Sequence, residues 1–284
     1  MDDRERRVVE AVKAALLEDA ARKDATTKLL VDAGRIGDAV IRAKAPGVVS
    51  GHDAAREAFR ALDPASAYSA SAPDGSRVEP GAAVARIYGR VRAILSAERT
   101  ALNFLQHLSG VATLAAAFAA RVAGTGAVIL DTRKTTPGLR FLEKEAVAHG
   151  GARNHRADLA AMILVKDNHI AAAGGIEAVL KKLGAARLAV CEIEVGSLAE
   201  LRALRETPPM RIMLDNFDPG GVAEAVAETR GWPVRPEIEV SGGVSLENAA
   251  AYAAAGIDFL SVGALTSRAG ALDMSLDLEG ADRR

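Results

Sequence analysis

Residues 131–170 read DTRKTTPGLRFLEKEAVAHGGARNHRADLAAMILVKDNHI, and the interpretation of the whole chain starts from this stretch. One apolar run, 127–130, leads into it, and a second, 162–165, lies near its end. Both runs are typical of buried strands that carry charged residues at their carboxyl ends. Apolar residues recur at helical spacing between Pro137 and Gly150, so the stretch predicts a strand, a helix and a second strand.

Several cations lie on the predicted loops and strand ends of this unit. They are Arg133, Lys134, His155, Arg156 and Lys166. In parallel α/β folds, ligands bind at these positions. Arg140, Lys144 and Arg153 are interpreted as ordinary surface charges, because a helix needs a polar outer face. A cation directly after a buried strand instead needs an anion nearby, either a protein carboxylate or a substrate.

Length and composition exclude several classes of protein. The 284 residues suffice for one large or two ordinary domains, and the net charge of -1 gives no basic footprint for nucleic acid. Cys191 is the single cysteine, which rules out a disulfide within the chain and fits a reducing compartment. Residues 1–20 carry charge throughout, and we expect no apolar run to be long enough to span a membrane, so a soluble cytoplasmic protein is expected.

The N-terminal part predicts a small mixed domain. An amphipathic helix is expected over 3–19, short strands at 38–43 and 84–88, and a long helix over 98–122. The turn spacing within 74–89 also occurs in lipoyl-like carrier modules. A carrier needs a modifiable lysine at a hairpin tip, and none lies nearby, so a small sheet used for packing is the preferred interpretation.

Beyond residue 127, apolar runs alternate with helical segments. The runs end near Asp131, Lys166, Val195, Asp215, Ser241 and Gly263. At least six such units predict a parallel sheet, and the lack of a GxGxxG turn favours an α/β barrel over a Rossmann sheet. A doubly wound sheet remains the alternative.

Four further strand ends carry groups suited to phosphate chemistry. Glu194 and Asp215 close neighbouring strands, where two carboxylates can hold Mg²⁺, stabilise a developing cation, or pair with the cations opposite. The sequence Ser241-Gly242-Gly243 and the glycine Gly263 follow the last two strands. Backbone N–H groups at such glycines bind phosphate oxygens, so these loops predict a phosphate site.

Eight blocks of sequence then point to a known family. In order they are ERTALNFLQHLSGVAT, DTRKTTPGLR, GGARNHR, ILVKDNH, EIEV, IMLDNF, EVSGGV and VGALT. The chain resembles the nicotinate-nucleotide pyrophosphorylases, the quinolinate phosphoribosyltransferases of NAD biosynthesis, over nearly its whole length. The resemblance implies a type II phosphoribosyltransferase fold, with a small N-terminal α/β sandwich domain at 1–104, an incomplete parallel α/β barrel at 105–267, and a segment 268–284 that packs back on the first domain.

The resemblance also implies an activity: transfer of phosphoribosyl from phosphoribosyl pyrophosphate to quinolinate with loss of CO₂, with Mg²⁺ and without an organic cofactor. The enzyme is expected to be a homodimer with shared active sites, whose dimers can associate further. Quinolinate would contact Arg99 of the other subunit, Arg133, His155, Arg156 and Lys166. Phosphoribosyl pyrophosphate would contact Lys134, Glu194, Asp215, Ser241, Gly242, Gly243 and Gly263. Catalysis would use Lys134, Lys166, Glu194 and Asp215, the last two also as metal ligands.

The chain departs from the family pattern at Lys23, Ala152 and Ser267, where the family has glycine, glycine and histidine; Arg268 follows the last of these. None of these departures touches the quinolinate cations. Two rival functions are a paralogue associated with molybdate transport and a non-catalytic sugar-phosphate binder. The paralogue is expected to differ at TTPG and KDNH, and both motifs are intact here.

Overall fold

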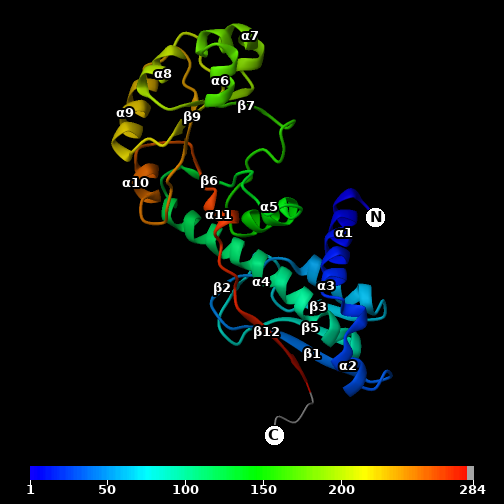
Figure 1. Cartoon of the computed structure of the whole chain (residues 1–284). Coiled ribbons are helices and arrows are strands. Elements are labelled where there is room, and N and C mark those ends of the chain that lie inside the picture. Colours follow the sequence, from blue (N-terminus) through cyan, green and yellow to red (C-terminus); the bar gives the residue numbers. More distant parts are fainter. Residues whose placement is uncertain (280–284) are drawn as a thin grey trace. The chain divides into compact units, whose positions relative to one another are not determined.

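The computed structural model describes residues 1–279, and the chain divides into two compact units (Figure 1). The first unit holds residues 1–116, 136–151 and the C-terminal segment from 268 onward. The second unit holds residues 117–135 and 152–267. The boundary that we predict between residues 104 and 105 stays a prediction, and the last residues of the predicted C-terminal segment, 280–284, lie outside the described part.

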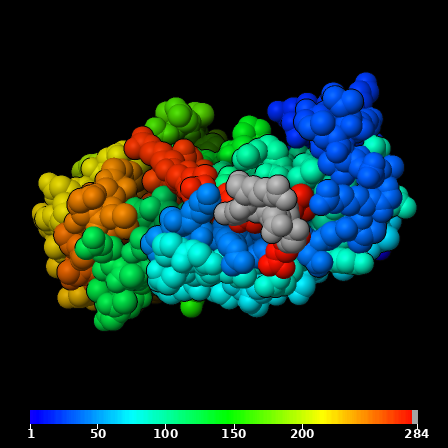
Figure 2. All heavy atoms as spheres, turned by 90° about the horizontal axis from the view of Figure 1, so that it is seen from below, coloured from blue at the N-terminus to red at the C-terminus, as the bar shows by residue number. Residues whose placement is uncertain are grey.

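The first unit is built on a four-stranded antiparallel sheet of order β12-β1-β5-β3. A short second pair, β2 with β4, accompanies it. The strands are β1 (Ile36–Ala43), β2 (Gly47–Val48), β3 (Ala67–Ala70), β4 (Arg77–Val78), β5 (Ala83–Arg90) and β12 (Met274–Leu278). Strand β12 pairs with β1 so that Leu276 lies opposite Ile41, and Figure 2 shows these red C-terminal residues beside blue N-terminal ones.

Helices complete the first unit. They are α1 (Asp3–Glu18), the 3-10 turn η1 (Ala21–Lys23), α2 (Ala25–Leu30), α3 (His52–Leu62), the first part of α4 (Val91–Val122) and α5 (Arg140–His149). Helix α1 buries Val8, Val12 and Leu16 along one stripe, as its apolar spacing predicts. Its N-terminus is closed by a capping box in which Asp2 and Glu5 each accept the other's backbone N–H.

The long helix α4 starts earlier than expected, at Val91, and ends at Val122 as predicted. Among the described residues it is the one helix that is long and apolar enough to span a membrane, which corrects the expectation that no run reaches that length. Within its most apolar window, 67% of the residues are buried in the protein. Burial of this extent is the pattern of a core helix.

Gly110, in the middle of α4, provides a test of this packing. A Cβ atom at this position would lie 1.9 Å from the carbonyl oxygen of Gly270 and 3.2 Å from Cα of Ala271. Because both are backbone atoms, the chain must shift, and we expect Gly110→Ala to lower the free energy of unfolding by about 3 kcal/mol. Chemical denaturation measures this change. Gly34→Ala, where the added atom meets nothing within 4 Å, should stay near wild type.

The second unit is built on six parallel strands in the order β6-β11-β10-β9-β8-β7. They are β6 (Val128–Leu130), β7 (Ile163–Val165), β8 (Cys191–Val195), β9 (Arg211–Asp215), β10 (Glu237–Ser241) and β11 (Phe259–Ser261). Strands β7 to β11 are neighbours in chain order, and the first strand lies beside the last. A doubly wound sheet would instead reverse its order at one strand, so the barrel prediction is confirmed.

Helices follow the strands of this sheet. They are α6 (Asp167–Ala173), α7 (Ile176–Leu188), α8 (Leu198–Ala203), α9 (Pro219–Thr229), α10 (Ala249–Ala254) and α11 (Ala264–Ser267). The connection from β6 to β7 is different, because its helix α5 belongs to the first unit. Strands β6 and β7 lie at opposite edges of the sheet, as in an incomplete barrel.

Helix α5 also begins later than predicted. We expected a start near Pro137, but the first helical residue is Arg140. The intervening Gly138 has a φ of +81°, in the left-handed region, which a right-handed helix cannot include. The following chain returns to β6, where Arg153 forms a parallel bridge with Leu130.

Candidate active site

A cavity of about 620 Å³ lies at the carboxyl ends of the parallel strands of the second unit. Most of the predicted site residues line it: Arg133, Lys134, His155, Arg156, Lys166, Glu194, Asp215, Ser241, Gly242 and Gly243. The strand ends bring these side chains together because all six strands point the same way. Sequence reasoning missed the other lining residues, which are Thr132, Leu164, Met213, Asn216 and Ser261.

Two guanidinium groups lie on one side of this cavity. Arg133 follows β6, and Arg156 lies on the loop after α5, where its Nη1 donates to the carbonyl of Met162 at 3.1 Å. Burial lowers the pKa of Arg156, and the positive charge of Arg133 lowers it further. Two cations that repel each other in a partly dry site favour an anionic ligand between them.

Two acidic side chains, Glu194 and Asp215, also line the cavity. Glu194 at the end of β8 is buried and pairs with the Lys166 ammonium, so the expected pairing between an acid and an opposing cation is present. Asp215 ends β9, and burial raises its pKa, with the neighbouring Glu194 charge acting in the same direction and Lys166 and Lys134 opposing. The two carboxylates thus repel each other, and a cation placed near both would relieve that repulsion.

The loop after β10 has a backbone conformation that requires glycine. Gly242 and Gly243 have φ values of +89° and +63°, which other residues rarely adopt. Asn216, itself at a φ of +58°, donates its backbone N–H to the carbonyl of Ser241 at 2.9 Å. On the far side, the amide of Asn248 donates to the carbonyl of Gly243 at 2.9 Å, so the loop is held from both ends.

Gly263 lies beside Lys134. A Cβ atom at residue 263 would come within 2.9 Å of the Lys134 side chain, so glycine leaves the space that this lysine occupies. Thr266 holds the same region, since its hydroxyl donates to the carbonyl of Lys134 at 2.8 Å. Ser267, one of the departures from the family pattern, donates its hydroxyl to the carbonyl of Gly263 at 2.9 Å.

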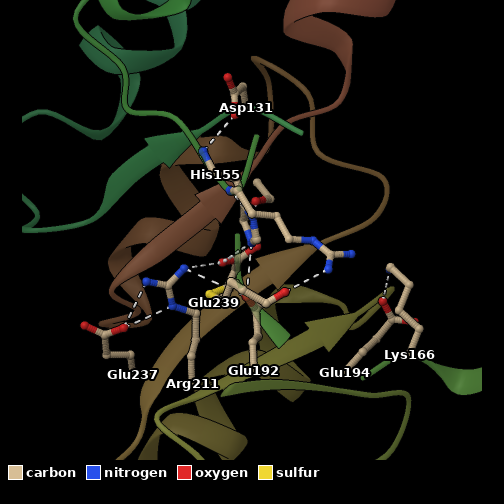
Figure 3. A network of polar contacts seen from close by, with 11 residues as sticks. Asp131, His155, Lys166, Glu192, Glu194, Arg211, Glu237 and Glu239 are labelled. Carbon is tan, nitrogen blue, oxygen red and sulfur yellow. Dashed lines mark hydrogen bonds and ion pairs between the residues drawn. The ribbon is translucent and has the colours of Figure 1, made fainter. Parts of the chain in front are cut away.

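Behind the cavity lies a buried polar network that sequence reasoning largely missed (Figure 3). His155 points from its loop toward Glu192 on β8 and Glu239 on β10, and Nε2 of the imidazole lies 3.0 Å and 3.6 Å from their carboxylates. Arg211 on β9 donates to Glu239 at 3.0 Å. The alternation of Glu192 and Glu194 in CEIEV was visible in the sequence, but the pairing across strands depends on register.

The three residues His155, Glu192 and Glu239 also have the composition of a metal site, with ligand atoms within 4.8 Å of one another. A protein cation already fills this role. Nη1 of Arg211 lies 3.0 Å from the carboxylate of Glu239 and 4.0 Å from that of Glu192. We therefore interpret the group as an ion-pair network.

Arg99, the remaining predicted site residue, lies on α4 in the first unit. It lines a separate cavity of about 520 Å³ in that unit, together with His107, Thr136 and seven further residues. His107 is hydrogen-bonded, as expected for a lone histidine on a helix: its Nε2 lies 2.8 Å from the buried carboxylate of Glu143. That carboxylate also accepts the backbone N–H of Thr136 at 3.0 Å.

Comparison with known proteins agrees with this architecture. Residues 24–109 match the family described as "Quinolinate phosphoribosyl transferase, N-terminal domain", and residues 111–277 match "Quinolinate phosphoribosyl transferase, C-terminal domain". The chain is 41% identical over 273 residues to the nicotinate-nucleotide pyrophosphorylase [carboxylating] of Mycobacterium leprae, covering 95% of this chain and 96% of that protein. The human protein of the same name is 38% identical, with 93% and 91% covered.

A solved structure gives the same result in three dimensions. The nicotinate-nucleotide pyrophosphorylase of Francisella tularensis superposes with a TM-score of 0.89 at 37% sequence identity, covering 97% of each chain. The matches of both domains and the sequence relatives agree with this structural likeness. The chain belongs to the quinolinate phosphoribosyltransferase family.

Proposed function

We propose that this protein transfers a phosphoribosyl group from phosphoribosyl pyrophosphate to quinolinate and releases nicotinate mononucleotide, pyrophosphate and CO₂. The observation that carries the proposal is one cavity that combines two repelling guanidinium groups, two lysines, two carboxylates and a glycine loop. A dicarboxylate and a polyphosphate are the kind of ligands that need this many fixed cations. The relatives at about 40% identity bear the name of this activity.

The cations divide between the two substrates. In this proposal Arg133 and Arg156, which both line the cavity, hold the carboxylates of quinolinate, since planar guanidinium groups bind carboxylates through paired hydrogen bonds. Lys166 pairs with Glu194 and can exchange that partner for a substrate carboxylate. Lys134 and the loop from Ser241 to Gly243, which line the same cavity, bind the phosphates in this proposal.

The chemistry follows from this division. When the bond between C1 of ribose and pyrophosphate breaks, its electron pair leaves with pyrophosphate and the ribose gains oxocarbenium character. The carboxylates of Glu194 and Asp215 stabilise this positive charge while the pyridine nitrogen attacks C1. The nitrogen is then quaternary, and the ring accepts the electron pair released when the adjacent carboxylate leaves as CO₂. Protonation of the ring carbon completes the product.

Mg²⁺ fits the same acidic pair. Glu194 and Asp215 supply the hard carboxylate oxygens that Mg²⁺ prefers. Burial raises the pKa of Asp215, and the negative charge of Glu194 raises it further. When bound, the metal would spread the negative charge of the departing pyrophosphate. The carboxylates themselves keep their position beside the ribose.

We also propose that the working form is a cytoplasmic homodimer in which Arg99 of one subunit completes the quinolinate site of the other. Arg99 belongs to the first unit and does not line the catalytic cavity of its own subunit, so a shared site would give this cation a role in substrate binding. Mixing Arg99→Ala and Lys134→Ala, each inactive alone, should restore about a quarter of wild-type activity if sites are shared and subunits exchange at random. Subunits that exchange without restoring activity would contradict a shared site.

A substrate comparison tests the function itself. The purified protein is incubated with Mg²⁺, phosphoribosyl pyrophosphate and either quinolinate or nicotinate, and nicotinate mononucleotide is measured by chromatography. We expect product from quinolinate alone. Product from nicotinate at a similar rate, or none from either substrate, would overturn the proposal.

A further inference from the structure

Both ring nitrogens of His155 are engaged inside the protein. Nδ1 accepts the backbone N–H of Arg156 at 2.7 Å, which places the ring proton on Nε2. Nε2 donates to Glu192 at 3.0 Å and lies 3.6 Å from Glu239. The side chain of His155 is 7% exposed, so the imidazole works as a link between the loop and the barrel interior.

Glu239 is the best-anchored member of this group. Its side chain is fully buried and accepts hydrogen bonds from Ser261 Oγ at 2.6 Å and from Arg211 at 3.0 Å. Burial raises the pKa of Glu239 to about 7, and the nearby carboxylate of Glu192 adds to this effect. A buried acid with this many donors is a fixed point, because moving it would leave several polar groups unpaired.

The loop that carries His155 depends on such fixed points. Residues 154–162 form no helix or strand. Asp131, buried at the end of β6, accepts the backbone N–H of His155 and the side-chain amide of Asn154, each at 2.8 Å. The backbone N–H of Arg156 donates to His155 Nδ1, so the fixed imidazole also fixes the backbone of Arg156, which lines the cavity.

We propose that Glu239, with Glu192, is a positioning residue of the quinolinate site: the two carboxylates fix the His155 imidazole from inside the barrel, and His155 in turn fixes the backbone at Arg156. This inference rests on the proposed function. It gives His155 a part in substrate binding that operates through the loop, and it gives a role to acidic residues that never reach the cavity.

Glu237 offers a matched control for Glu239. Both residues lie on β10 and bind the same guanidinium, but Glu237 binds Nε and Nη2 of Arg211 at 3.0 Å, whereas Glu239 binds Nη1. The side chain of Glu237 is 42% exposed, and its carboxylate forms no ion pair with His155 in the described part of the chain. Replacing the two residues therefore separates a loss of charge around Arg211 from a loss of support for His155.

The test measures KM for each substrate separately in Glu239→Ala, Glu239→Gln and Glu237→Ala. We expect Glu239→Ala to raise KM for quinolinate about tenfold and to leave KM for phosphoribosyl pyrophosphate within about twofold. Glu239→Gln keeps an oxygen acceptor for the buried donors and should restore most of the affinity for quinolinate. Glu237→Ala should match wild type for both substrates.

Three results would overturn the inference: an unchanged KM for quinolinate in Glu239→Ala, an equal rise in both KM values, or no recovery in Glu239→Gln. Should the alanine variant fail to fold, Glu239→Asp replaces it, since the charge stays while the carboxylate withdraws from His155, and the same selective rise is expected. Wild type is measured alongside. No turnover of quinolinate by wild type would overturn the proposed function as well, whereas normal turnover with an unaffected variant would overturn the positioning role alone.

Discussion

Arg133→Ala is expected to lower kcat/KM for quinolinate about a thousandfold. The guanidinium lies in the same partly dry cavity as Arg156, close enough to lower the pKa of that residue. Removing one partner of a buried ion pair costs about 2–5 kcal/mol, because the other partner stays desolvated and unpaired. A loss of about 4 kcal/mol, within that range, corresponds to about a thousandfold change in rate. Steady-state kinetics with quinolinate varied at saturating phosphoribosyl pyrophosphate measures the effect.

Arg153→Ala is the control for this prediction. Arg153 is another arginine near the same strand, but its side chain is exposed, and it is interpreted as a surface charge. Its backbone N–H and carbonyl, which bond to Ile129 and Asp131, remain in the alanine variant. Arg153→Ala should stay within about twofold of wild type. Near-normal kcat/KM in Arg133→Ala would remove Arg133 from the quinolinate site.

Gly242→Ala is expected to raise KM for phosphoribosyl pyrophosphate by about a hundredfold. A Cβ atom at residue 242 would lie 2.2 Å from Oδ1 of Asn216 and 3.0 Å from its backbone nitrogen, and the φ of +89° is unfavourable for alanine. The loop must therefore move, and its N–H groups lose their alignment with a phosphate. Overpacking with backbone strain costs about 3 kcal/mol, which corresponds to this change in affinity.

Gly243→Ala separates the two causes. Gly243 also has a positive φ, +63°, but a Cβ atom there meets nothing within 4 Å. Only the conformational penalty of about 1 kcal/mol applies, so KM for phosphoribosyl pyrophosphate should rise less than tenfold. Equal effects of the two substitutions would show that contact with Asn216 is unimportant for the loop.

Much of the cavity could be predicted from the sequence, because parallel strands place their carboxyl ends at one edge. Lys166, Glu194 and Asp215 each close an apolar run, and the structure brings all three into one cavity. The self-neutralised pair of Lys166 and Glu194 followed from the same reasoning, since an anion site without its ligand tends to bind a protein carboxylate. These predictions needed only strand direction.

Features that depend on how strands pair were not predictable. The network around Glu239 depends on the hydrogen bond from Arg211, which lies on the neighbouring strand β9. The register of β9 and β10 places Met213 opposite Glu239, and Arg211 is two residues before Met213, on the same face of the sheet. The assignment of α5 to the first unit was also missed, because helical periodicity indicates which face is buried and leaves its partner open. Asn216 was missed because its contribution to the site depends on its left-handed backbone conformation, which the sequence does not reveal.

The ratio of CO₂ to nicotinate mononucleotide shows whether this chain is a decarboxylating phosphoribosyltransferase. Quinolinate labelled in the carboxylate next to the ring nitrogen is incubated with the protein, Mg²⁺ and phosphoribosyl pyrophosphate, and labelled CO₂ and mononucleotide are counted together. We expect one CO₂ for each mononucleotide, with no label left in the product. A mononucleotide that retains the label, or label released without phosphoribosyl pyrophosphate, would contradict this expectation.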